Sequence, residues 1–272
     1  MEDLKRSCVH TITTKPWPIE TAVEKYAAAG IAGITVWRDA LEGRSLPAVR
    51  KRIADAGLAL VSTCRGGFFA STDADIRTAR IAENLRAVDE AAELGAPHLV
   101  LVCGADPKQS LETSRAQIGE GIAAVLPRAR ERGVKLAVEP LHPMYADTRS
   151  AIVSLAQAND LVEGIGDPSL GIAVDVYHLW WDPALQEQIA RAGRSGAILA
   201  FHVCDWNTPT ADLLNDRALM GDGCIDLKRI RGWVEETGWR GFVETEIFST
   251  LWWSRDQDGF LAEIRKRYLT SV

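Results

Sequence analysis

Short apolar runs alternate with amphipathic segments along almost the whole chain. The runs carry little charge until their last residues, as His98-Leu-Val-Leu-Val102 and Gly171-Ile-Ala-Val-Asp175 show. The segments between them repeat their apolar positions with a period near 3.6 residues, which predicts helices. Continuous apolar strands separated by helices are typical of a parallel sheet that is covered on both faces.

We predict eight strands, and a helix after each strand. The strands are expected at residues 7–13, 33–36, 58–63, 98–102, 135–139, 171–175, 198–202 and 242–246. The helices are expected at residues 19–29, 46–56, 75–94, 111–132, 149–162, 183–192, 227–237 and 256–268. Such a chain fits an α/β fold of the (β/α)8 TIM-barrel type, as a single domain over residues 1–272. A doubly wound open sheet is the alternative, but no G-x-G-x-x-G or P-loop turn follows an early strand.

Composition narrows the class of protein. Hydrophobic residues make up 47% and charged residues 25% of the chain, as in ordinary globular enzymes. No apolar run approaches the roughly 18–20 residues that span a bilayer, and no signal-peptide core follows the charged start. The net charge of −6 disfavours nucleic acid and anionic membranes as partners. The five cysteines form no C-x-x-C pair, so a disulfide framework is not expected and a cytoplasmic location is.

Four consecutive predicted strands end in a residue that can bind a metal ion. They are Glu139, Asp175, His202 and Glu246. One such residue alone often serves as a helix cap, an ion-pair partner or a core histidine. Active-site groups of TIM barrels lie at the carboxyl ends of the strands, so four of them can converge near the axis. Three carboxylates and one imidazole favour one divalent cation, Mn²⁺ or Mg²⁺, with Co²⁺ or Zn²⁺ as alternatives.

Motifs around these residues carry a resemblance over essentially the whole chain. They are Glu139-Pro-Leu-His142-Pro, Asp175-x-x-His178, His202-x-x-Asp205, Arg217 ahead of Gly221-Asp-Gly223, and Glu244-Thr-Glu246-Ile-Phe. The chain resembles the sugar phosphate isomerase/epimerase superfamily, the xylose-isomerase-like TIM barrels. That superfamily includes ketose 3-epimerases, hydroxypyruvate isomerase, inosose isomerases and dehydratases, and AP-endonuclease-like barrels. The resemblance implies that the four strand-end residues ligate one divalent cation.

The resemblance also implies proton transfer next to a carbonyl, through an enediolate that the metal stabilises as a Lewis acid. By resemblance to ketose epimerases, Glu139 and Glu246 are the acid/base pair. A lyase acting on an inosose or a 3-keto-glycoside would use the same apparatus and is the alternative. A metal-dependent phosphodiester hydrolase fits less well, because that branch uses additional histidines and this chain has five in all. No glycine-rich turn opens a helix after strand seven or eight, which favours an unphosphorylated substrate.

Further residues are candidates for contacts with a sugar or cyclitol substrate. They are His142, His178, Arg217, Trp37, Arg65 and His10. The resemblance implies His178, since a family histidine contacts a substrate hydroxyl, and Arg217, since a family arginine reaches the substrate or a ligand carboxylate. His142 could act as His178 does, or hold a carboxylate behind the ligands. Strand-end position suggests the other three, and a tryptophan also offers a flat wall for sugar C–H faces. Solvated or packed loop residues would look the same in sequence.

Two expectations complete the prediction. Glu244 shares the strand face of Glu246, and we expect it to pair with a basic group inside the barrel rather than to bind the metal. The irregular stretch 205–226 is the longest loop, and loops of this length in compact domains are usually functional. By resemblance alone, a homo-oligomer is also expected.

Overall fold

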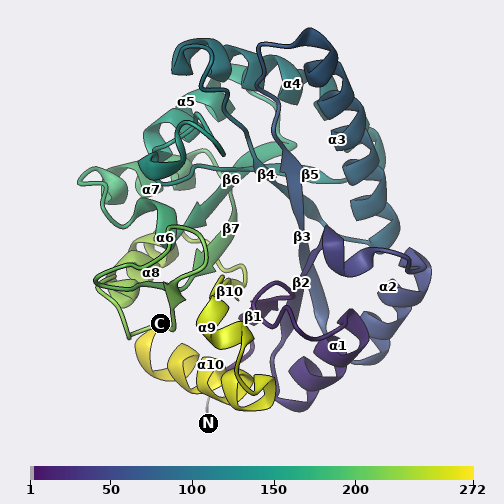
Figure 1. Cartoon of the computed structure of the whole chain (residues 1–272), viewed down its shortest axis with the longest axis vertical. Coiled ribbons are helices and arrows are strands. Elements are labelled where there is room, and N and C mark those ends of the chain that lie inside the picture. Colours follow the sequence, from purple (N-terminus) through teal and green to yellow (C-terminus); the bar gives the residue numbers. More distant parts are fainter. Residues whose placement is uncertain (1–2) are drawn as a thin grey trace.

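Eight parallel strands close into a barrel in the computed structural model, which describes residues 3–272 (Figure 1). In order around the ring they are β1 (Ser7–His10), β10 (Val243–Thr245), β7 (Ile198–Val203), β6 (Leu170–Asp175), β5 (Lys135–Glu139), β4 (His98–Val102), β3 (Ala59–Gly67) and β2 (Gly33–Trp37). The TIM barrel is therefore confirmed over the open doubly wound sheet. Residues 1 and 2, which the predicted domain includes, lie outside the described residues.

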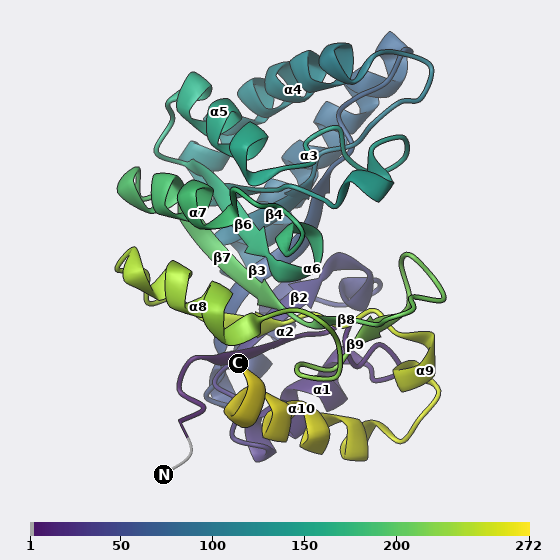
Figure 2. The same ribbon diagram turned by 90° about the vertical axis from the view of Figure 1, so that its left-hand side faces the viewer.

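Helices cover the outside of the ring. They are α1 (Ile19–Ala28), α2 (Leu46–Asp55), α3 (Ala74–Leu94), α4 (Leu111–Arg132), α5 (Leu155–Ile165), α7 (Leu185–Arg194), α8 (Leu227–Glu236) and α10 (Gln257–Ser271). Figures 1 and 2 show them around the strands, with α3 and α4 side by side. Their apolar faces and the outer faces of the strands form one large core. Among residues 3–272, no helix is both long and apolar enough to cross a membrane.

Short elements interrupt several of the predicted loops. They are η1 (Arg38–Leu41), η2 (Pro143–Tyr145), α6 (Val176–Leu179), α9 (Thr250–Trp253), and the antiparallel pair β8 (Asp205–Trp206) and β9 (Arg217–Ala218). The two-residue pair β8 and β9 forms a sheet of its own beside the ring (Figure 2). The long loop 205–226 is therefore partly ordered by backbone pairing.

The prediction of a helix from residue 149 is wrong, since α5 begins at Leu155. Residues 149–152 instead bond to neighbouring strand ends: Gly104 donates to the Arg149 carbonyl, and Ala151 donates back to the Gly104 carbonyl. Ser154 then caps the helix by accepting from the Gln157 backbone. Backbone hydrogen bonds to the end of β4 thus determine the conformation of this segment, although its local sequence pattern is helical. The first strand is also shorter than predicted, because residues beyond His10 fold into turns.

The barrel interior has its own layer of small side chains. Cys64, Val100, Ala137, Ala173 and Ala200 form a cluster separate from the main core. Side chains alternate between the two faces of a strand, so the residue two positions after each of these alanines also faces inward. Those three residues are Glu139, Asp175 and His202. The small layer beneath them leaves space above it for polar groups at the carboxyl end of the barrel.

Asp205 organises the loop that follows β7. One carboxylate oxygen accepts from the backbone nitrogens of Trp206 and Ile225, and the other accepts from Gly221. A Cβ at position 223 would lie 2.4 Å from Asp205 Oδ1 and 2.3 Å from the Trp206 carbonyl oxygen, so only glycine fits there. These contacts explain why the aspartate and the glycine turn accompany each other in the sequence.

Candidate active site

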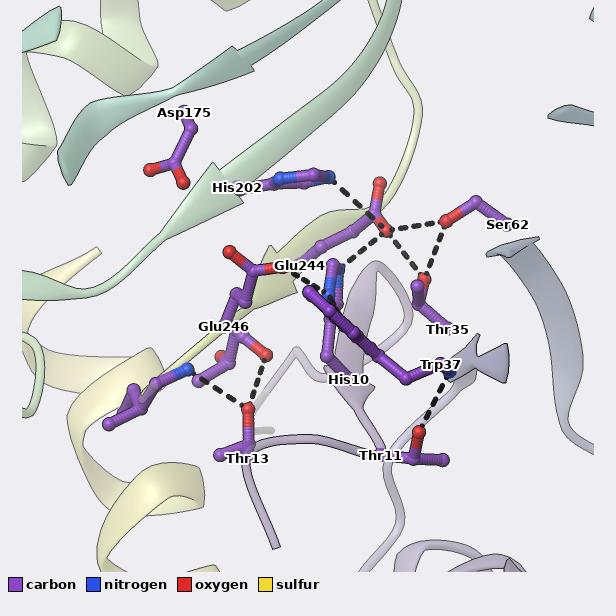
Figure 3. Close-up of polar contacts among 12 residues, drawn as sticks. His10, Thr11, Thr13, Thr35, Trp37, Ser62, Asp175, His202, Glu244 and Glu246 are labelled. Carbon is purple, nitrogen blue, oxygen red and sulfur yellow. Dashed lines mark hydrogen bonds and ion pairs between the residues drawn. The ribbon is translucent and has the colours of Figure 1, made fainter. Parts of the chain in front are cut away.

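The four residues predicted to bind a metal lie together at the carboxyl end of the barrel. Glu139 ends β5, Asp175 ends β6, His202 lies in β7 and Glu246 directly follows β10. One donor atom from each lies within 4.8 Å of the donor atoms of the other three, and all four residues are buried. Strand register brings them level, since Asp175 pairs with His202 and His202 pairs with Glu244, two residues before Glu246. Figure 3 shows three of the four converging.

The donor set fits a divalent cation, because it offers carboxylate oxygens and an imidazole nitrogen from one side. Burial raises the pKa of Asp175, Arg217 opposes this, and the neighbouring Glu139 and Glu246 raise it further, to about 7. Three buried carboxylates in contact thus hold more negative charge than the surrounding protein neutralises. His202 Nδ1 lies 2.9 Å from Glu139 Oε1, while His202 Nε2 has no hydrogen-bond partner in residues 3–272. A cation among these atoms would relieve the excess of negative charge.

Arg217 holds two members of the set in place. Its Nη1 donates to Glu246 Oε2 at 2.8 Å and to Asp175 Oδ2 at 3.3 Å. Its guanidinium carbon lies 4.4 Å from the ring centre of Tyr177 and 4.9 Å from that of Phe248. Burial alone would lower the pKa of Arg217, but Asp175 and Glu246 hold it well above its ordinary value. The guanidinium is therefore a fixed positive charge beside the carboxylates.

His10 and Glu244 form a buried ion pair below the metal-binding set. His10 Nε2 lies 3.1 Å from Glu244 Oε2, and His10 Nδ1 lies 2.9 Å from Glu246 Oε1 (Figure 3). Thr35 also donates to Glu244 Oε2, at 2.6 Å. Burial lowers the pKa of His10, but Glu246 and Glu244 outweigh it and raise the pKa to about 9. Burial raises the pKa of Glu244, but His10 and His202 lower it to about 2.

A small cavity opens beside the metal-binding set. Glu139 and Glu246 line it, and among its other walls are Trp37, His178, Arg217 and Leu214. It offers about 20 Å³ to water-sized spheres, which is about the space of one water molecule. Leu214 belongs to the long loop after β7, so that loop closes the site. A keto sugar requires this loop or the wall side chains to move.

Three of the predicted substrate contacts therefore meet at the cavity: His178, Arg217 and Trp37. His178 Nε2 lies 3.3 Å from Arg217 Nη2, and burial and Arg217 together hold the pKa of His178 well below its ordinary value. Trp37 Nε1 lies 3.3 Å from His10 Nδ1, which joins this wall to the buried ion pair.

The other three candidates do not line the cavity. His10 is fully buried between carboxylates. His142 is half-buried, with its ring centre 5.1 Å from that of Trp206, and burial lowers its pKa. The Arg65 guanidinium carbon lies 4.3 Å from the ring centre of Phe68. A role of any of them in binding substrate stays a prediction.

Apart from Trp37, sequence reasoning did not name the apolar wall residues of the cavity, and it also missed two residues with polar groups, Tyr145 and Arg149. Both follow β5, the strand that supplies Glu139. Their position in a loop at the carboxyl end of the barrel was an available signal. The predicted helix at 149–162 obscured it for Arg149, because helices of this fold pack on the outside.

Comparisons with known proteins agree with this architecture. The sequence model of a family described as xylose isomerase-like TIM barrel matches residues 23–266. An inosose isomerase of Halalkalibacterium halodurans is 28% identical over 123 residues, which is 44% of this chain and 42% of that protein. The match thus takes in less than half the length of that relative.

Two solved structures superpose over nearly the whole chain. Protein SMc04130 from Sinorhizobium meliloti 1021 is 46% identical, covers 99% of each chain and gives a TM-score of 0.95. The IOLI protein, solved with a binding zinc atom, is 19% identical, covers 98% of each chain and gives a TM-score of 0.85. The second likeness concerns the fold alone, and its zinc belongs to that protein.

Proposed function

This chain belongs to the xylose isomerase-like TIM barrel family, and we propose that it is a divalent-metal-dependent isomerase or epimerase of a small keto sugar or keto-cyclitol. One observation carries the proposal: Glu139 and Glu246 belong both to the four-residue donor set and to the cavity wall. Two carboxylates are thus held where a cation and the carbon atoms of a substrate would meet. The similarity to an inosose isomerase supports isomerase chemistry.

Glu139, Asp175, His202 and Glu246 would hold the cation. A divalent cation there would supply Lewis-acid stabilisation of the negative charge that develops when a proton leaves the carbon next to a carbonyl. Mn²⁺ and Mg²⁺ suit the three carboxylates best, and Zn²⁺ or Co²⁺ are the alternatives.

We assign the proton transfers to Glu139 and Glu246. They come from β5 and β10, which β6 and β7 separate in the ring, so the two carboxylates approach the cavity from different strands. One can accept the proton of a C–H bond held within reach, and the other can return a proton to a different carbon or face. Burial raises the pKa of Glu246, but His10 and Arg217 hold it well below its ordinary value, so this carboxylate is ionised at neutral pH.

The remaining cavity residues position the substrate and exclude water. His178 has a depressed pKa, so its ring is neutral and can both donate to and accept from hydroxyl groups. Arg217 keeps Glu246 oriented through a 2.8 Å hydrogen bond. Trp37 and Phe248 supply apolar wall, which suits the C–H faces of a sugar.

Deuterium uptake tests the proposal. Protein stripped of metal and reloaded with Mg²⁺ would be followed by proton NMR in D₂O with ketohexoses, ketopentoses, inososes, 3-keto-glucosides and hydroxypyruvate. We expect metal-dependent exchange at a carbon next to the carbonyl of at least one compound. Glu139→Gln and Glu246→Gln should each slow it at least a hundredfold, since general acid–base groups contribute about 10²–10⁴.

Glu93→Gln is the matched control, because Glu93 is exposed near the end of α3, away from the carboxyl ends of the strands. The product separates isomerisation or epimerisation from water loss, which would instead indicate the lyase. A protein that takes up no divalent cation, or whose exchange is unchanged in both glutamine variants, would refute the assignment.

A further inference from the structure

We propose that Arg149 and Arg65 form a subsite for an anionic group of the substrate, a carboxylate or a phosphate, at the edge of the cavity. The inference rests on the proposed function for the ketone part of the substrate, and it narrows the substrate class to acids or phosphate esters. It starts from two arginines that form no ion pair with any carboxylate within residues 3–272.

The two arginines lie on neighbouring segments. Arg149 lines the cavity together with Glu139. The segment after Arg65 pairs with the β4 end, where Phe68 donates to the Val102 carbonyl at 2.8 Å. Two residues further along that β4 end, Gly104 donates to the Arg149 carbonyl, also at 2.8 Å.

Both guanidinium groups rest on rings of one apolar cluster. The Arg65 guanidinium carbon lies 4.3 Å from the ring centre of Phe68, and that of Arg149 lies 5.7 Å from the ring centre of Tyr145. Phe68 and Tyr145 pack in the same small cluster, which also contains Val102 and Leu141. Val102, Leu141 and Tyr145 of this cluster line the cavity, as Arg149 does, so Arg65 is held on the same cluster that forms one cavity wall.

Neither cation forms an ion pair with a carboxylate of the described residues. Within residues 3–272, no carboxylate oxygen lies within the 4.0 Å ion-pair distance of either guanidinium. Arg38, at the end of the neighbouring β2, differs: it bonds to Glu83 at 2.7 Å and to Glu90 at 2.6 Å. Burial lowers the pKa of Arg65, and Arg149 lowers it further, as expected for cations that repel each other.

Neither arginine is needed to balance the charges of the active site once a divalent cation is bound. One divalent cation and Arg217 would together balance the three carboxylates of the donor set. Glu244 is balanced by His10. Arg65 and Arg149 are therefore surplus positive charge in a partly buried place, where an unpaired charge costs free energy.

An anion bound between the two guanidinium groups would offset the free energy that their unpaired charge costs. A guanidinium presents a planar fork of N–H donors that matches carboxylate and phosphate oxygens. A substrate whose ketone lies at Glu139 and Glu246 could place an acidic group against Arg149 on the same side. No glycine-rich phosphate turn follows β7 or β10, so the arginines would carry the recognition by themselves.

Binding of small probes tests the subsite separately from catalysis. D-Glycerate, glycerol 3-phosphate and neutral glycerol would be titrated calorimetrically into the wild type and into Arg149→Gln, Arg65→Gln and the double variant. Each titration is run with Mg²⁺ and again with EDTA, because a carboxylate that binds only through the metal is lost in EDTA. Arg52→Gln is the control, since it removes one exposed positive charge on α2.

We expect at least one anionic probe to bind each single variant at least tenfold more weakly than it binds the wild type. The same probe should bind Arg52→Gln as tightly as the wild type. Both results should hold with Mg²⁺ and with EDTA. The probe with the larger loss identifies the group as carboxylate or phosphate. Arg149→Lys keeps the charge without the fork and should recover part of the affinity, which loss of folding would not allow. Equal binding of both anions to the wild type and the double variant would overturn the proposal.

Exchange experiments then distinguish this inference from the proposed function. Hydroxypyruvate and a ketopentose 5-phosphate would be compared with neutral ketoses, with the expectation that Arg149→Gln raises the KM of an anionic ketone at least tenfold. Exchange confined to neutral ketoses overturns the anionic subsite and leaves the isomerase standing. Arginine-dependent binding of anions without exchange of any ketone supports the subsite and counts against the isomerase.

Discussion

Two layers of side chains inside the barrel come from the same four strands or their carboxyl ends and face the same way, yet the upper layer is wholly polar and the lower one holds three alanines. The upper layer is Glu139, Asp175, His202 and Glu246, and the lower layer is Ala137, Ala173, Ala200 and Glu244. Strand alternation puts both layers inside, since their members are two residues apart. Fold alone therefore does not decide which positions carry a site.

The difference lies in how each charge is balanced. In the lower layer, the charge of Glu244 is met by His10 and by the hydroxyl group of Thr35. In the upper layer, Asp175 retains a pKa of about 7 although Arg217 lies beside it. Asp175 thus differs from Glu244 and Glu246, whose pKa values the chain's own partners hold below the ordinary value, and a buried charge left short of partners in this way indicates a ligand.

Replacing one carboxylate in each layer by its amide should give the largest difference between a structural charge and a ligand charge, measured as the change in the free energy of unfolding. In metal-free protein, Glu244→Gln should lower the free energy of unfolding by about 3 kcal/mol, because a buried ion pair loses one partner. Breaking a buried ion pair costs roughly 3–5 kcal/mol, and we expect the low end of this range because His10 keeps its contact with Glu246. Asp175→Asn should change the free energy of unfolding by less than about 1 kcal/mol, since it relieves repulsion among carboxylates and an asparagine oxygen can still accept from the Tyr177 backbone.

Urea unfolding in EDTA at pH 8, repeated with Mn²⁺, measures both effects. Mn²⁺ should stabilise Glu244→Gln but not Asp175→Asn, which has lost a ligand. Equal losses of stability in the two metal-free variants would mean that the layers do not differ in role.

Strand alternation made the upper layer predictable from the sequence. Apolar runs that end in Glu139 or Asp175 can be recognised without coordinates, because TIM barrels place their chemistry at strand ends. Glu244 could be predicted to need a basic partner, but not which one. That His10 is the partner depends on β1 and β10 lying side by side when the ring closes, and no local pattern encodes ring closure.

Arg149 shows the other limit of the sequence. Ala151, Ile152 and Leu155 are spaced as on a helix face, so local pattern favours a helix through Arg149. The backbone of this segment instead pairs with Gly104 at the end of β4. That pairing is a tertiary contact, and it turns the side chain of Arg149 from an expected helix exterior into the cavity wall.

His10, which lies between Glu246 of the upper layer and Glu244 of the lower one, should also give the metal-free protein a pH dependence. The folded-state pKa of His10 is about 9, above the ordinary value of about 6.5. The folded state therefore binds this proton more tightly, so the stabilisation is complete below pH 6.5 and is lost as the pH rises to about 9. A shift of this size corresponds to about 3 kcal/mol, and His202, raised to about 9 as well, acts in the same direction.

Urea unfolding in EDTA between pH 6.5 and 9 measures this dependence. His10→Asn should flatten the decline with pH while leaving the contribution of His202. An unchanged slope in His10→Asn would show that the buried ion pair does not hold the proton, and the balance of charge in the lower layer would need another explanation.

The loop that carries Leu214 lies over the upper layer, and weakening its attachment should give the smallest effect. The hydroxyl groups of Tyr145 and Tyr177 both donate to the Leu213 carbonyl, next to Leu214 in the cavity wall.

Tyr145→Phe and Tyr177→Phe each remove one neutral hydrogen bond, worth about 1 kcal/mol, and keep the ring that supports an arginine. Amide hydrogen exchange across residues 207–216 should therefore rise about fivefold in each variant, because closure of the loop loses that much free energy. Tyr26→Phe removes a buried hydroxyl group on α1 that bonds to Thr14 and donates to the His10 carbonyl. It lies far from the loop in sequence and serves as the control. Exchange that rises equally in the control, or in none of the variants, would mean that these hydroxyl groups do not hold the loop closed, and that the cavity must open by rearrangement of its other walls.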